Sequence, residues 1–152
     1  MALPQVFNPE VAQQLINRIN KLTPESKPQW GTMNASQMLA HCNVTYEYVF
    51  NERADKPNFL VKWMLKKFVK KKVVDEIPYE KNIRTAPAFI VPDNKNFDKE
   101  KARLEKYINR VVELGEQAFQ GKESNSFGVL TIQEWNNMMY KHLDHHLNQF
   151  GV

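Results

Sequence analysis

Three of the four histidines in the chain lie close together near its carboxyl end, at positions 142, 145 and 146, and the fourth is His41. Side chains four residues apart on a helix share one face, with Cβ atoms about 5–6 Å apart. His142 and His146 can therefore direct imidazole nitrogens at the same ion. His145 follows His142 by three residues, so spacing alone equally allows the pair of His142 and His145. In either case the spacing predicts a metal site built on one helix.

The apolar pattern before the histidines favours His146 as the second ligand. Large side chains recur at alternating spacings of three and four residues, which is typical of the packed face of a bundle helix. His145 falls outside this face and is predicted to support a neighbouring side chain or to lie at the surface. The residues on the face are Ile132, Trp135, Met139, His142, His146 and Gln149.

Other donor residues and common site motifs fit less well. Asp144 lies two residues from His142 on another helix face, and Cys42 is predicted to be a small buried hydrophobic residue beside His41. Leu143 directly follows His142, whereas a zinc-protease helix needs glutamate at that position as general base. The chain has no glycine-rich phosphate loop and only one cysteine, which excludes nucleotide-binding motifs and Cys-x-x-Cys zinc modules.

Length and composition indicate one globular domain over residues 1–152. The chain is 42% hydrophobic and 25% charged, which is ordinary for a single domain with a substantial core. We find neither a secretory signal pattern nor an apolar run of about 18 residues, the minimum for a transmembrane helix. A lone cysteine agrees with a reducing compartment. We therefore expect a cytoplasmic protein.

The formal net charge of +4 has a local origin. Much of the excess lies in residues 62–72, whereas the signs are mixed elsewhere. Such a run is more often a solvated helix face than a binding site for an anionic partner. Basic and aromatic residues do not interleave along a strand-like groove, so we expect no nucleic-acid binding.

Capping residues and periodicity predict an all-α fold. Asn8 followed by Pro9 is a typical helix start, Asn34 or a neighbour can cap a second helix, and Gly121 is a candidate helix stop. The prolines of residues 78–92 indicate an extended connection, in which residues 86–91 can form a short strand. We predict a four-helix bundle with a long crossover connection and one extra short amphipathic helix. The main helices are predicted at residues 9–22, 34–52, 97–120 and 131–150, and the extra helix at 59–73.

Two sequence motifs resemble those of the DinB/YfiT-like metalloproteins, in particular a subgroup described only as a domain of unknown function. The first comprises the runs Trp30-Gly31-Thr32-Met33 and Gln37-Met38-Leu39-Ala40-His41, and the second is His142-x-x-His145-His146-x-x-Gln149. The resemblance covers nearly the whole chain. It implies a four-helix bundle with a long crossover, in which a histidine of the second helix joins a His-x-x-x-His pair of the last helix around zinc or nickel.

Carried onto this chain, the resemblance implies the ligands His41, His142 and His146. The Arg-Gly pair that usually follows the last ligand is replaced by Leu147-Asn148, so no role of that pair carries over. Relatives in this superfamily include transferases and isomerases that use the thiols bacillithiol or mycothiol. The resemblance therefore predicts the site more closely than it predicts the reaction.

Three neutral histidines leave a fourth coordination position for water or substrate, as in catalytic rather than structural zinc sites. We therefore expect a metal-dependent enzyme of the hydrolase or thiol-transferase kind, acting on a small molecule, with thiols among the candidates. Side chains that can line its pocket or support its ligands are His145, Gln149, Tyr46, Tyr48 and Trp30.

The alternative is a non-enzymatic module in which the metal only holds the helices together. Its basic helix, with Trp63, Met64 and Phe68 among the lysines of residues 62–72, would dock on an anionic membrane or an acidic protein. A homodimer is compatible with both hypotheses.

Overall fold

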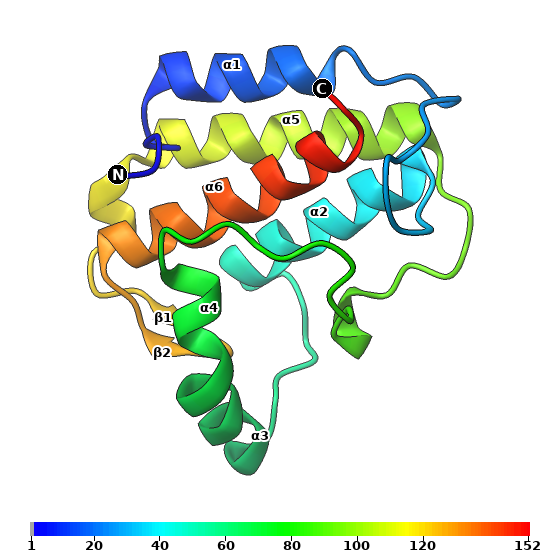
Figure 1. Ribbon diagram of the computed structural model, residues 1–152. Helices are drawn as coiled ribbons and strands as arrows, with labels where there is room; N and C mark the ends of the chain where they lie inside the picture. The colour runs from blue at the N-terminus through cyan, green and yellow to red at the C-terminus, as the bar shows by residue number, and fades with distance from the viewer. Residues whose placement is uncertain (1) are drawn as a thin grey trace.

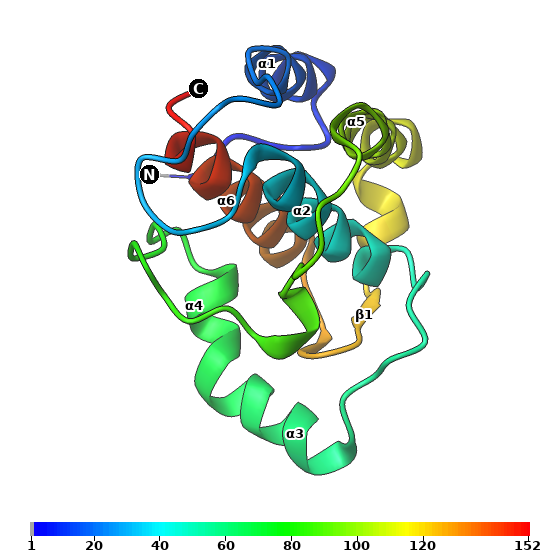
Figure 2. The same ribbon diagram turned by 90° about the vertical axis from the view of Figure 1, so that its right-hand side faces the viewer.

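Four long helices pack side by side in the computed structural model, which describes residues 2–152. They are α1 (Pro9–Ile19), α2 (Ala35–Val49), α5 (Phe97–Leu114) and α6 (Ile132–Gln149). Both α1 and α2 contact α5 and α6, so α1 and α2 lie at opposite corners of the bundle (Figures 1 and 2). The predicted all-α four-helix bundle with a long crossover is confirmed.

Side chains at the helix starts satisfy backbone donors that have no partner within the helix. Asn8 caps α1 and is followed by a proline at the first helical position. Asn34 and Gln37 form a reciprocal capping box at the start of α2, and Thr131 and Glu134 form another at the start of α6. These local contacts set where the two histidine-bearing helices begin.

Three of the main helices end earlier than predicted, and α2, which was predicted to extend to residue 52, stops at Val49. Helix α1 stops at Ile19, although Leu22 still reaches the core from the following turn. Helix α5 stops at Leu114 because Gly115 has a φ of +67°, and a 3-10 turn, η3 (Glu116–Phe119), then continues the chain. An unpredicted antiparallel hairpin of β1 (Glu123–Ser124) and β2 (Gly128–Val129) leads into α6.

The core lies between the four helices. On α6 it includes Trp135 and Met139, as the sequence predicted for that face, and also Leu143 and Leu147. Burial of apolar side chains of this kind is the main favourable contribution to folding. Packing of this face fixes the rotation of α6 about its own axis relative to α2.

The crossover between α2 and α5 contains the extra helix. It consists of α3 (Phe59–Met64), a π-helical turn η1 (Leu65–Val69) and α4 (Lys70–Val74), so the predicted helix at 59–73 is present. The chain then crosses the α2 and α6 side of the bundle (Figure 1). The predicted strand at 86–91 is wrong: the segment contains a 3-10 turn, η2 (Pro87–Phe89), because it packs on α2 and has no neighbouring strand to pair with.

No helix within residues 2–152 is both long enough and apolar enough to cross a membrane.

Candidate metal centre

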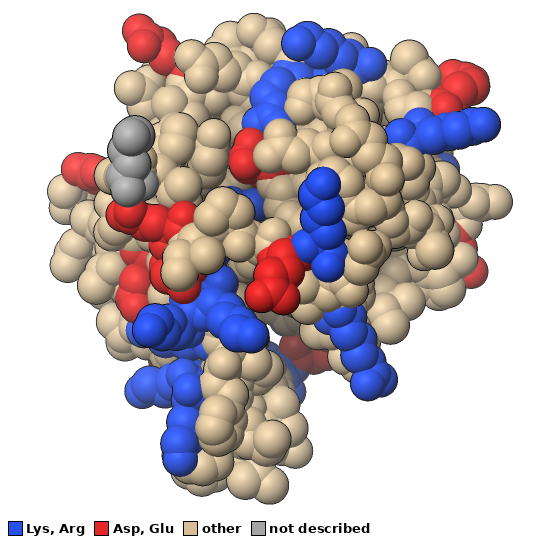
Figure 3. All heavy atoms as spheres, viewed as in Figure 1, with Lys and Arg blue, Asp and Glu red and all other residues tan. Residues whose placement is uncertain are grey.

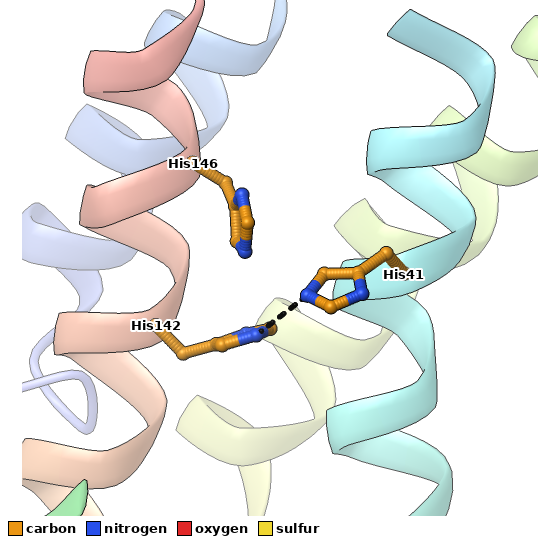
Figure 4. Close-up of side chains that lie close together, drawn as sticks. All are labelled: His41, His142 and His146. Atoms are coloured by element: carbon orange, nitrogen blue, oxygen red, sulfur yellow. Dashed lines mark hydrogen bonds between the residues drawn. The ribbon is translucent and has the colours of Figure 1, made fainter. Parts of the chain in front are cut away.

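Helices α2 and α6 bring three histidines together inside the bundle. His41 comes from α2, while His142 and His146 come from successive turns of α6, and their rings point at a common centre (Figure 4). One nitrogen from each ring lies within 4.8 Å of the other two. The Nε2 atoms of His41 and His142 are 3.0 Å apart. This is the only group of three or more metal-type ligands in residues 2–152.

The Nδ1 atoms of His41 and His146 are engaged away from this centre. His41 donates from Nδ1 to the backbone carbonyl of Phe89 at 2.8 Å, and His146 donates from Nδ1 to Oε1 of Gln149 at 2.8 Å. The amide of Gln149 is oriented by its own donation to the carbonyl of Trp30 at 2.7 Å. A neutral imidazole with its proton on Nδ1 presents a lone pair on Nε2, so two nitrogens are ready to accept an ion.

His142 has a partner that can accommodate either ring tautomer. Its Nδ1 lies 3.1 Å from Oγ1 of Thr45, and a hydroxyl can donate or accept. With the proton on Nε2, His142 donates to Nε2 of His41 and receives the hydroxyl proton of Thr45. With the proton on Nδ1, His142 donates to Thr45, and its Nε2 lone pair joins those of the other two histidines.

Burial keeps all three histidines neutral. It lowers the pKa of His41, against an opposing contribution from the hydrogen bond to Phe89. The pKa of His142 falls well below its usual value through burial and then through the neighbouring His146 and His41. Burial, followed by the nearby His41, lowers the pKa of His146 to about 3, against the opposing bond to Gln149. Neutral imidazole is the form that binds metal, so the cluster is in its ligating state at neutral pH.

His145 does not belong to the three-nitrogen group. Its ring lies edge-on to Trp30 at 5.8 Å and to Tyr79 at 5.6 Å, and it lines a surface cavity of about 210 Å³ with both. Its ring centroid is 5.1 Å from that of His146. Asp144 pairs with Arg18 at 2.6 Å, on a face away from the cluster, as the spacing predicted.

The remaining predicted pocket residues lie at different distances from the cluster. Tyr46 is buried and stacks on Tyr107 of α5 at 5.6 Å, which makes it a core residue between these helices. Tyr48 lies beside Phe89 at 5.6 Å and donates to Asp55, so it contacts the site only through Phe89. Cys42 is buried, and burial raises the pKa of its thiol, which agrees with the prediction of a small buried hydrophobic residue.

The sequence analysis missed the roles of Thr45 and Phe89. Thr45 carried a weak signal, because it lies four residues after His41 on the same face of α2. Phe89 carried none, since any residue can supply a backbone carbonyl. Its ring also lies 5.7 Å from that of His41 and 6.1 Å from that of His142, so the crossover covers one side of the cluster.

Comparison with known proteins places the chain in a family. A family model described as "Protein of unknown function (DUF1569)" matches residues 8–151. The chain belongs to this family. The match to DUF1569 spans all four bundle helices and therefore all three clustered histidines. No curated protein and no solved structure matches the chain.

Proposed function

We propose that this DUF1569 protein is a metal-dependent enzyme of the hydrolase or thiol-transferase kind. Its ligands would be His41, His142 and His146, and zinc or nickel would be the ion. The observation that carries this proposal is the convergence of three histidines, two buried and one half-buried, whose Nδ1 atoms each have a hydrogen-bond partner outside the cluster. Such partners fix the ligand orientation in known metal sites.

The donor set fits a borderline divalent ion with an exchangeable position. Imidazole nitrogens suit zinc and nickel, and three protein ligands are typical of catalytic sites. Within residues 2–152, no cysteine or carboxylate joins the three histidines as a fourth donor. When bound, such an ion acts as a Lewis acid that favours deprotonation of a water or thiol at the remaining position.

The residues around the cluster contribute orientation and water exclusion. Phe89 and Gln149 accept hydrogen bonds from Nδ1 of His41 and of His146, which keeps the proton on these nitrogens. The apolar ring of Phe89 also covers one side of the cluster. The packing of α2 against α6 brings the ligands of the two helices together. A preorganised site of this kind loses little free energy to rearrangement when a ligand binds.

Membership of the DinB/YfiT-like superfamily is part of the proposal. It is supported by the helical bundle with its long crossover and by the position of one histidine on α2 and two on α6. The thiol-dependent transferases of that superfamily are the reason for including thiol transfer. The three-histidine donor set by itself supports hydrolysis equally well.

The test is cobalt substitution of the purified protein. We expect one equivalent of Co²⁺ to bind, and we expect azide or a small thiol to change its visible spectrum while circular dichroism stays constant. A His41→Ala variant serves as control and should lose the cobalt spectrum. The enzyme proposal would be overturned if the cobalt spectrum did not change on addition of azide or thiol and a fourth protein donor were found on the ion, because the site would then be structural.

A further inference from the structure

The helical arm formed by α3, η1 and α4 (residues 59–74) stands away from the bundle. Figures 1 and 2 show it projecting from the side of α6, with α4 nearest the bundle and α3 at the far end. Its anchor is at α4, where Lys141 of α6 donates to the carbonyls of Lys72 and Asp75 at 2.7 and 2.9 Å. Asn137 also donates to the carbonyl of Val74 at 2.9 Å. The arm is thus anchored through α4, and one ion pair, Lys62 to Glu123, also ties α3 to β1.

The outer part of the arm exposes large apolar side chains. No residue of α3 or η1 is buried. Phe59 is 87% exposed, Phe68 61% and Trp63 48%. Leu60 and Met64 are exposed on the same segment. Scattered exposed apolar residues are normal, but a cluster of five within ten residues indicates a surface that binds something.

The same arm carries strong positive charge. Residues 56–74 contain no acidic side chain, and the six lysines of residues 62–72 all lie on the arm. Lys62 pairs with Glu123 and Lys70 with Glu134. The other four form no ion pair within the part of the chain that the structure describes, and all are exposed. These are Lys66, Lys67, Lys71 and Lys72.

Apolar and basic groups adjoin one another on the surface of the arm. Nζ of Lys67 lies 4.9 Å from the ring centre of Trp63 and 5.3 Å from that of Phe68. In Figure 3, the lower projection presents a continuous uncharged area bordered by Lys or Arg side chains. A partner must therefore accept aromatic side chains and compensate positive charge over the same few residues.

We propose that the arm docks on an anionic membrane surface, with its apolar side chains in the headgroup region and its lysines at lipid phosphates. A lipid surface supplies both requirements together, whereas a purely apolar partner leaves the lysines uncompensated. A second copy of the chain paired arm to arm would bring the same unpaired lysines against one another. Charge complementarity thus favours the anionic bilayer over either of these occupants.

The test measures binding of the full-length chain to vesicles by co-sedimentation. Vesicles of phosphatidylcholine alone are compared with vesicles that contain about one-third phosphatidylglycerol, an anionic lipid. The arm variant changes Lys66, Lys67, Lys71 and Lys72 to glutamine. The matched control makes the same change at Lys21, Lys27, Lys95 and Lys99, which are exposed lysines elsewhere and give the same net charge.

We expect binding to the anionic vesicles only. Each lysine near such a surface contributes roughly fivefold in affinity, so removing all four should weaken binding of the arm variant by about 600-fold, while the control stays near wild type. Lipids brominated in the upper acyl chain should quench fluorescence of the wild type, and Trp63→Phe should remove most of this quenching while binding persists.

Several results would overturn the proposal. Equal losses in the arm and control variants would assign binding to net charge, and equal binding to neutral vesicles would remove the role of the lysines. Absence of binding to either vesicle would exclude a membrane partner. A dimer in sedimentation velocity that the triple change Phe59→Ser, Trp63→Ser and Phe68→Ser dissociates, without vesicle binding, would assign the arm to a second copy.

Discussion

Replacing Thr45 by valine removes one hydroxyl from the cluster and leaves its shape nearly unchanged. Thr45 is buried, and its Oγ1 lies 3.1 Å from Nδ1 of His142, whose other ring nitrogen faces the cluster. Thr45→Val therefore leaves Nδ1 of His142 without a hydrogen-bond partner. Neither the tautomer nor the tilt of the ring is then fixed by a hydrogen bond at this nitrogen. All three histidines remain in place, so the variant should still bind one metal ion.

The expected loss is in affinity. Removing a partner that orients a metal ligand typically costs 10–100-fold, which corresponds to about 1.4–2.7 kcal/mol of binding free energy. The free energy of unfolding of the metal-free protein should fall by about 1–2 kcal/mol, because one buried polar group loses its hydrogen bond.

Competition with a chromophoric zinc chelator measures the dissociation constant, and urea unfolding measures stability. Thr45→Ser is the matched control, because it retains the hydroxyl and should bind zinc much more tightly than Thr45→Val. Wild-type zinc affinity in Thr45→Val, or equal weakening in both variants, would refute the role assigned to the hydroxyl.

Three further predictions concern the ligands, the pH dependence and the arm. His146→Ala should lose bound metal on purification while His145→Ala retains it, as measured by elemental analysis; the reverse result would exchange their roles. In the metal-free protein, the lowered pKa of His146 means that the unfolded state binds more protons below pH 6.5, so stability is lost as pH falls. For this residue the loss from pH 7 to pH 5 is about 2 kcal/mol, and the His146→Gln variant should show a correspondingly flatter dependence in urea unfolding. Lys141→Met should cost about 2–4 kcal/mol, because two backbone carbonyls and the carboxylate of Asp75 lose a buried cationic donor; Asp75→Asn, which keeps the carbonyl contacts, should cost less.

Local sequence information predicted most of the bundle because helix signals are local. The apolar spacing through Trp135 and Met139 marks the inward face of α6, and the caps at Asn8, Asn34 and Thr131 mark helix starts. The predictions were wrong where a longer-range contact or a single backbone angle determines the local conformation. Gly115 ends α5 early, and residues 86–91 are not a strand because no other strand lies beside them.

The sequence by itself determined which residues can form the cluster: a histidine pair one helical turn apart on the inward face of the last helix, and a third histidine on the second helix. Spacing alone left His145 and His146 as alternatives, because spacings of three and four residues are both compatible with one face, and the apolar pattern of the last helix favoured His146. The tertiary structure groups His146 with His41 and His142, since the packing of α6 against α2 sets the rotation of the helix about its axis.

Only the tertiary structure decided which groups form hydrogen bonds with the Nδ1 atoms of these rings. The carbonyl of Phe89 reaches His41 from 48 residues away, and the hydroxyl of Thr45 reaches His142 from 97 residues away. Backbone carbonyls carry no residue-specific signal, and a hydroxyl on one helix acquires this role only when another helix packs beside it. The types and spacing of the histidines are local properties of the chain, whereas their tautomers and orientation depend on contacts that form only when the crossover and α2 pack around α6.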